Sequence, residues 1–153
     1  MKKLLTLFLI VISYSTAIAQ TKFMKTYTFQ EAFSRGYSGL QTFDGGYILL
    51  GMIPDGSNSN FYFVKTDSNG DTLWTKQYCS SEPSNIANWG YFVKQTSDSG
   101  YVATGYTGTS VSGYIQDIFV IRTNSIGDTL WTKTFGVQGG SAQTSSKIYE
   151  TDD

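Results

Sequence analysis

The chain has 153 residues, with 11 basic and 12 acidic side chains and a formal net charge of −1 at pH 7. It contains no histidine, which removes the usual general base of Ser-His-Asp and Cys-His catalysis and the commonest zinc ligand. The basic side chains are scattered and only Arg35 and Arg122 are arginines, so the electrostatic pattern of nucleic-acid binding is absent. Cys79 is the only cysteine, so no disulfide can form within one chain.

Residues 1–19 have the pattern of a secretory signal peptide. Two lysines precede an apolar run at 4–12, and small residues at 17–19 form a cleavage site. The alternative is a membrane anchor, but this run is too short to cross about 30 Å of hydrocarbon. We therefore expect the mature protein to begin at Gln20, without a transmembrane segment. It would be secreted to the extracellular space or cell surface, with the periplasm as an alternative.

The rest of the chain is built from repeated units. Residues 65–76 read KTDSNGDTLWTK, and residues 122–133 read RTNSIGDTLWTK. Residues 41–47, QTFDGGY, return at 95–101 as QTSDSGY, and residues 150–153 begin the same element a third time. Repeats of this length are typical of solenoids, propellers and arrays.

Each unit predicts a first hairpin. Residues 47–52 and 101–106 are β-favouring runs that follow Asp-Gly-Gly and Asp-Ser-Gly, which are residues of tight turns. The incoming strands are then predicted at 40–42 and 92–96.

Each unit also predicts a second hairpin. Residues 61–64 and 118–121 are apolar without alternation, which indicates strands buried on both faces. After a glycine-containing turn, residues 72–78 and 129–135 return as the fourth strands, with Trp74 and Trp131 at equivalent positions.

Four strands joined by hairpins, stacked on neighbouring units, predict an all-β fold. The expected architecture is a partial β-propeller of four-stranded antiparallel blades, with about two full blades plus flanking single strands. A β-solenoid and a sandwich are the alternatives. The expected organisation is a signal peptide at 1–19, a leading fourth strand and connection at 20–39, blade 1 at 40–78, an inter-blade loop at 79–91, blade 2 at 92–135, and a connection with the first strand of an incomplete third blade at 136–153.

A closed propeller has about four to eight blades, so the remaining blades are expected outside this chain. Two blades alone would leave open strand edges and apolar faces, which promote aggregation. We therefore expect the chain to be the N-terminal piece of a longer protein.

Three segments resemble the tandem propeller repeats of secreted Bacteroidetes-type proteins. They are residues 45–51 (GGYILLG), 63–76 (FVKTDSNGDTLWTK) and 96–106 (TSDSGYVATGY). The resemblance covers essentially all of the mature chain. It implies a propeller architecture and export, often as cargo of type IX secretion, and it implies no particular activity because such proteins are mostly uncharacterised.

Binding is expected in the connections that differ between copies, because variable loops on a rigid scaffold commonly carry binding residues. These connections are residues 28–38, 53–60, 79–91 and 107–117. The expected binding residues within them are Trp89, Tyr37, Arg35, Tyr114, Glu82 and Asp55. Trp89 is the most prominent, since an indole suits stacking on a sugar or anchoring a protein contact. The alternative is that Trp89 packs under its loop as a hydrophobic plug, whereas Trp74 and Trp131 are predicted to pack between blades.

The turn at residues 67–71 has two weak resemblances to functional motifs. Its alternating oxygen side chains suggest a calcium loop, but its glycine and the missing distal acid do not fit that motif. It is also similar to the Asp box of sialidase propellers, with one residue too many in each half. Both comparisons favour a structural hairpin, and we expect no metal site.

Catalysis is not predicted. A paired-carboxylate glycosidase mechanism could use Asp55, Glu82 or Asp117, but their spacing selects no pair. The sequence therefore predicts a secreted, non-enzymatic β-propeller repeat scaffold that binds an extracellular protein or glycan and uses no cofactor. The alternative is the N-terminal fragment of a glycosidase-like propeller hydrolase whose catalytic residues lie outside this chain.

Overall fold

A computed structural model of the chain describes residues 23–27, 34–56, 58–80, 86–109, 115–136 and 147–151. Every regular secondary-structure element among these residues is a β-strand, which confirms the predicted all-β class. The strands are β1 (Arg35–Gln41), β2 (Tyr47–Asp55), β3 (Asn58–Thr66), β4 (Thr72–Tyr78), β5 (Ile86–Gln95), β6 (Tyr101–Thr109), β7 (Ile115–Thr123) and β8 (Thr129–Phe135). Within the described ranges, no helix has the length and apolarity needed to span a membrane. The predicted signal peptide lies outside them.

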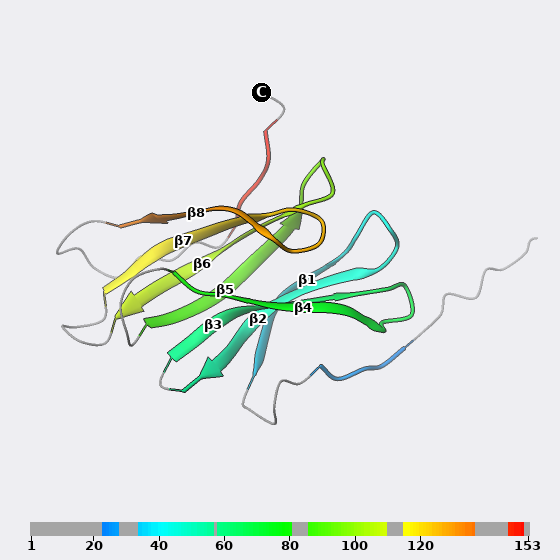
Figure 1. The fold of residues 1–153 in the computed structure, drawn as a ribbon, viewed down its shortest axis with the longest axis horizontal. Helices are drawn as coiled ribbons and strands as arrows, with labels where there is room; N and C mark the ends of the chain where they lie inside the picture. Colours follow the sequence, from blue (N-terminus) through cyan, green and yellow to red (C-terminus); the bar gives the residue numbers. More distant parts are fainter. Residues whose placement is uncertain are drawn as a thin grey trace, which may run out of the picture.

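The eight strands form one mixed, open sheet that consists of two antiparallel groups. Strands β1 to β4 pair in chain order, and strands β5 to β8 repeat that order. A single parallel bridge between Ser59 of β3 and Ala87 of β5 joins the groups. We call β1–β4 unit 1 and β5–β8 unit 2. Figure 1 shows the two units lying one above the other.

The strand boundaries agree with the sequence at the second hairpin and differ at the first. Strands β4 and β8 have the predicted bounds. Strands β1 and β5 begin at Arg35 and Ile86, well before the predicted starts at 40 and 92. In both strands a register shift at a Gly-Tyr pair interrupts the alternation of side chains between the two faces. The alternating sequence pattern therefore ends at the bulge, although strand pairing continues on its N-terminal side.

The core lies between the two units. Strand β3 of unit 1 presents Phe61 and Phe63, and the ring of Phe61 meets Phe119 of β7 edge-on at a centroid distance of 5.3 Å. The opposite face of β3 presents Tyr62 and Val64, which are also buried. The prediction that this strand is buried on both faces is therefore confirmed.

A cation braces the first hairpin of each unit, and it is buried in unit 1 and partly buried in unit 2. In unit 1 the ammonium of Lys65 pairs with Asp44 at 2.8 Å and also donates to the carbonyl of Thr66. In unit 2 both carboxylate oxygens of Asp98 accept from Arg122 at 2.6 Å. These hydrogen bonds fix the turn against the third strand, and they explain why a lysine or arginine recurs at this position of the repeat.

The Asp44 pair predicts that acid destabilises the fold. The hydrogen bond from Lys65, helped by Thr42 and the amide of Gly46, lowers the pKa of Asp44 from 3.8 to about 2. Because the folded pKa is the lower one, this stabilisation is present above pH 3.8 and is lost as the pH falls through about 2. The Asp44 side chain is more than half exposed, so solvent screens its interaction with Lys65. We therefore expect this ion pair to contribute only about 1 kcal/mol to the free energy of unfolding. Hydrogen bonds from Thr96 and Arg122 also lower the pKa of Asp98, and a hydrogen bond from Lys76 lowers that of Asp128.

Urea unfolding midpoints measured over this acid range test the prediction. The wild type should lose stability as the pH falls, and Asp44→Asn should show a weaker pH dependence. A wild-type midpoint that rises toward low pH would contradict the assignment.

Candidate functional site

Three of the six predicted binding residues lie together in one cluster. Arg35 and Tyr37 from β1 lie against Trp89 from β5. Tyr91 of β5 contacts the ring of Tyr37, and Tyr106 of β6 contacts the ring of Trp89. We call these five residues the aromatic–arginine cluster. The prediction that Arg35, Tyr37 and Trp89 occupy variable loops is wrong, because all three lie within strands.

The cluster is built on two equivalent β-bulges. The register shifts between Gly36 and Ser38 in β1, and between Gly90 and Phe92 in β5. Tyr37 and Tyr91 are thus the extra residues of the two bulges, and bulges commonly redirect side chains next to functional sites. Their rings meet edge-on at a centroid distance of 5.1 Å.

A glycine opposite each bulge permits this arrangement. Gly51 of β2 faces the carbonyl oxygen of Arg35, and Gly105 of β6 faces that of Trp89. A Cβ atom at either glycine would lie 1.9 Å from the facing oxygen. Only glycine therefore lets the neighbouring strand approach the bulge this closely.

Trp89 is held by its neighbours on several sides. Its indole nitrogen donates a hydrogen bond to the hydroxyl of Ser59 at 3.0 Å. Its ring stacks with Tyr106 at 5.6 Å and with Tyr37 at 6.2 Å, and the Arg35 guanidinium lies 5.8 Å from the ring centroid. Such a tryptophan is an anchor for the cluster and not a freely exposed stacking platform.

The cluster also contains hydroxyl groups, one of which is buried. The Tyr37 hydroxyl is buried and has no hydrogen-bond partner within the described part of the chain. Burial raises the pKa of Tyr91, nearby Tyr37 adds to this rise, and a hydrogen bond with Tyr106 opposes it. The Tyr91 phenol therefore stays protonated at neutral pH. Tyrosine hydroxyls can both donate and accept hydrogen bonds. A buried polar atom without a partner is costly, which favours a ligand group that pairs with it.

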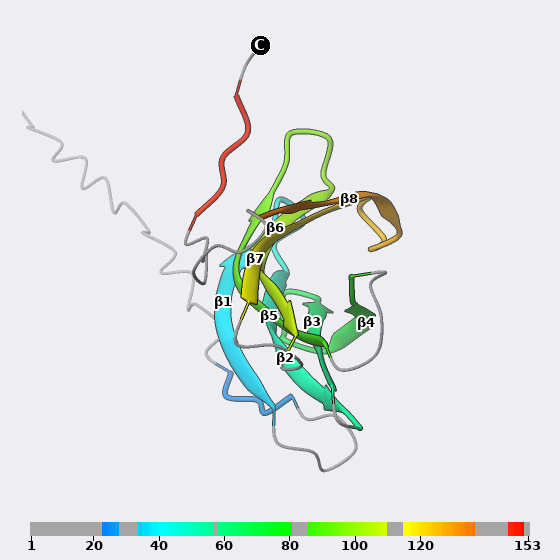
Figure 2. The same cartoon turned by 90° about the vertical axis from the view of Figure 1, so that its left-hand side faces the viewer.

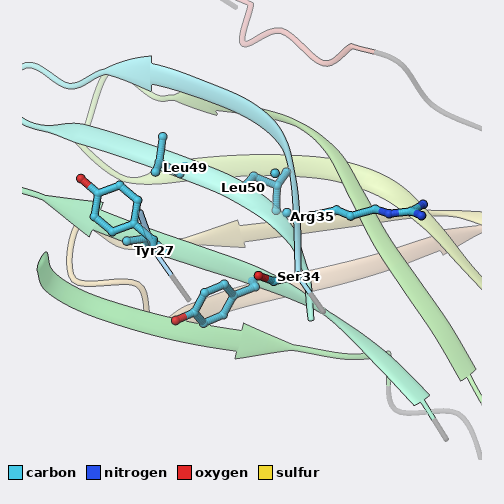
Figure 3. A pocket seen from close by; sticks show the side chains of 9 residues that line it. Tyr27, Ser34, Arg35, Leu49 and Leu50 are labelled. Atoms are coloured by element: carbon cyan, nitrogen blue, oxygen red, sulfur yellow. The ribbon is translucent and has the colours of Figure 1, made fainter. Parts of the chain in front are cut away.

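A small hollow of about 80 Å³, open to solvent, adjoins the cluster on the outer face of unit 1. Apolar side chains, including Leu49 and Val64, form much of its wall, and Tyr27 and Arg35 also line it. In Figure 3 the Arg35 side chain extends away from Tyr27. Arg35 thus touches both the hollow and the Trp89 ring, so it connects the two features.

Of the other three predicted binding residues, only Asp55 lies among the described residues, and it is not part of the cluster. Asp55 is the last residue of β2, and its carboxylate accepts a hydrogen bond from the side-chain amide of Asn60 at 3.1 Å. Tyr114 and Glu82 lie outside the described residues. No group of three or more cysteine, aspartate or glutamate side chains suited to a metal ion occurs within the described ranges.

The turn at 67–71 closes by hydrogen bonds of its own. The Asp67 carboxylate accepts from the backbone amides of Asn69 at 2.9 Å and Asp71 at 2.8 Å. Asn124 makes the same contacts in unit 2, with Ile126 and Asp128. In each turn a side-chain oxygen of Asp or Asn accepts hydrogen bonds from the backbone amides two and four residues later, which stabilises the turn locally. This role accounts for the recurring Asp or Asn at the position.

Sequence reasoning missed Tyr91 and Tyr106. A signal for Tyr91 was available, because Gly90-Tyr91 repeats Gly36-Tyr37 in the alignment of the two units. Tyr106 was assigned to a strand without a role. Its contact with Trp89 follows from their pairing across β5 and β6, where the two residues lie directly opposite each other.

Comparisons with known proteins do not identify the site. No protein-family model matches the chain, and no curated protein matches it significantly.

Proposed function

We propose that this protein is a secreted, non-enzymatic binding scaffold of β-propeller type, and that the aromatic–arginine cluster binds an extracellular protein or glycan. The observation that carries the proposal is the convergence of Arg35, Tyr37 and Trp89 on two bulged strands, where the buried Tyr37 hydroxyl has no hydrogen-bond partner among the described residues. Side chains of these three types dominate the energetics of many binding interfaces.

The chemistry of the cluster favours a ligand with oxygen groups. Arg35 is exposed and offers a guanidinium that can pair with a carboxylate, while Tyr37 can donate to a hydroxyl or carbonyl oxygen. The cluster residues themselves include no carboxylate, thiol or imidazole, which are the side chains that most often act as general bases or nucleophiles near neutral pH. This composition supports binding over catalysis.

Architecture and location rest on the sequence. The two equivalent four-stranded units, the resemblance to tandem propeller repeats and the signal-peptide pattern support a secreted repeat protein. In this proposal further blades complete the ring, and units 1 and 2 are two consecutive members of the series.

A glycan array with neutral and acidic glycans, probed with the mature chain, tests the binding role. We expect Arg35→Gln to weaken a bound glycan by about tenfold or more, because a hot-spot arginine contributes upwards of ~2 kcal/mol. Trp131→Ala is the matched control, since it removes an exposed tryptophan away from the cluster. Equal binding by wild type and Arg35→Gln would remove the cluster from the site. If no glycan binds, the protein-ligand half of the proposal remains.

Tyr37→Phe then tests the unpartnered hydroxyl. It removes one oxygen atom and keeps the ring in the cluster. We expect weaker binding without a loss of stability, because in the free protein this hydroxyl has no described partner to lose.

A further inference from the structure

Strand β4 docks on unit 2 through three alternate side chains, Trp74, Lys76 and Tyr78. The Tyr78 hydroxyl donates to the carbonyl oxygen of Gly127 at 2.6 Å, and Lys76 forms an ion pair with Asp128. Gly127 and Asp128 belong to the turn between β7 and β8, which Figure 2 shows on the same side of the molecule as β4. We call this set of contacts the latch.

The latch requires glycine at its centre. Gly127 has a φ of 81°, a left-handed conformation that favours glycine. A Cβ atom there would lie 3.0 Å from the Trp74 ring, so the indole covers this glycine closely. The ring of Trp74 also meets Tyr101 of unit 2 at 6.0 Å.

The same latch holds the leading segment against unit 1. Lys25 pairs with Asp71 at 2.5 Å, and the Tyr27 hydroxyl donates to the carbonyl of Gly70 at 2.8 Å. Gly70 has a φ of 78°, and a Cβ atom there would lie 2.4 Å from the Phe23 ring. An aromatic, a lysine and a tyrosine at alternate positions thus dock twice on a Gly-Asp turn.

Strand β8 carries a third copy of these side chains, and no turn among the described residues receives them. Trp131 is 42% exposed and Phe135 is 51% exposed, whereas Tyr78 at the equivalent position is 8% exposed. Lys133 forms no ion pair within the described part of the chain and lies 5.7 Å from the centroid of its own neighbour Trp131. Strand β8 therefore presents the donor half of a third latch, and the ranges that the structure describes contain no acceptor half for it.

Residues 147–151 contact unit 2 in the way that the first strand of unit 2 contacts unit 1. Glu150 accepts a hydrogen bond from the backbone amide of Ser97 at 2.8 Å. Gln95 accepts in the same way from the amide of Phe43 at 2.8 Å. Because Gln95 belongs to the first strand of unit 2, Glu150 occupies the corresponding position of a following unit.

We propose that β8 and residues 147–151 form the docking surface for a third four-stranded unit of this repeat, which continues from residues 147–151 as its first strand. Its second hairpin would present a glycine to Trp131 and the following aspartate to Lys133. The charge of Lys133 and the two occupied latches argue for this occupant. This inference rests on the propeller-type series proposed above and is independent of the aromatic–arginine cluster.

The third latch lacks a hydroxyl group that both of the others contain. Phe135 replaces Tyr27 and Tyr78, so it cannot donate to the glycine carbonyl. The third unit would therefore dock through the ion pair and the indole alone, and Phe135→Tyr should strengthen its docking.

The test extends the full chain after Asp153 with a second copy of residues 45–78, which keeps the order of the repeat from Thr151 onward. A second version carries residues 99–135 instead. Acetylation of Lys133 and radical oxidation of Trp131 are followed by mass spectrometry. We expect both reactions to slow in the extended chains, with Lys133 approaching the rate of the latched Lys76. Phe135→Tyr should slow the oxidation of Trp131 further.

Charge reversal assigns the effect to the latch. Asp71→Lys in the appended copy alone should restore the fast oxidation of Trp131, and adding Lys133→Asp should slow it again. If neither extension protects Trp131 and Lys133, or if Asp71→Lys changes nothing, the proposal is wrong. Protection that grows with protein concentration would assign the surface to a second copy and would also overturn it. None of these outcomes affects the glycan-binding test with Arg35→Gln.

Discussion

Phe61→Ala is expected to lower the free energy of unfolding by about 3–5 kcal/mol. Phe61 is fully buried on β3, and its ring meets Phe119 of β7 at 5.3 Å across the contact between the units. Removing the ring loses apolar burial from both units and leaves a cavity that rigid strands on each side cannot readily close. Urea denaturation followed by far-ultraviolet circular dichroism measures the change.

Phe43→Ala is the matched control for Phe61→Ala. Phe43 lies in the turn between β1 and β2 and is 71% exposed, so its loss should change stability by less than about 0.5 kcal/mol. A similarly small effect for Phe61→Ala would mean that the two units do not depend on this contact.

Gly105→Ala is expected to destabilise the protein by about 2–3 kcal/mol and to disturb the aromatic–arginine cluster. The new methyl group would lie 1.9 Å from the carbonyl oxygen of Trp89 and 2.8 Å from the ring of Phe61. Neither neighbour can yield easily, because one is strand backbone and the other is core. The strands must therefore separate at the bulge that carries Tyr91.

The site and the stability can be followed separately in this variant. In a background with Trp74→Phe and Trp131→Phe, Trp89 is the only tryptophan, and its fluorescence should change in Gly105→Ala. Gly36→Ala is the control within the equivalent bulge, since a Cβ atom there meets nothing within 4 Å. If Gly36→Ala and Gly105→Ala destabilise equally, the close approach of the strands is not what requires glycine.

The repeat pattern was sufficient to predict the strands whose side chains follow it. The bounds of β4 and β8 and the burial of β3 on both faces follow from local sequence, because unbroken apolar runs and tight turns report the environment of a strand directly. The starts of β1 and β5 did not follow, because a bulge inserts one residue and reverses the alternation beyond it.

The binding residues illustrate the same division. Trp89, Tyr37 and Arg35 were selected by type and by their absence from the obvious repeat, and the structure brings these three together. Their assignment to loops was wrong because the bulges in β1 and β5 conceal the N-terminal parts of these strands in the sequence. Asp55 was selected by the same reasoning and instead bonds to Asn60, which no sequence pattern indicated.

The sequence by itself determined that this protein is made of equivalent four-stranded units, since spacing, turn residues and apolar runs are properties of the chain. Only the tertiary structure decided which residues at the same repeat position also have the same degree of burial. Trp74 and Trp131 occupy the same repeat position, yet Trp74 packs on unit 2 while Trp131 is exposed. Burial depends on what lies across the interface, and that is a long-range contact which local sequence does not encode.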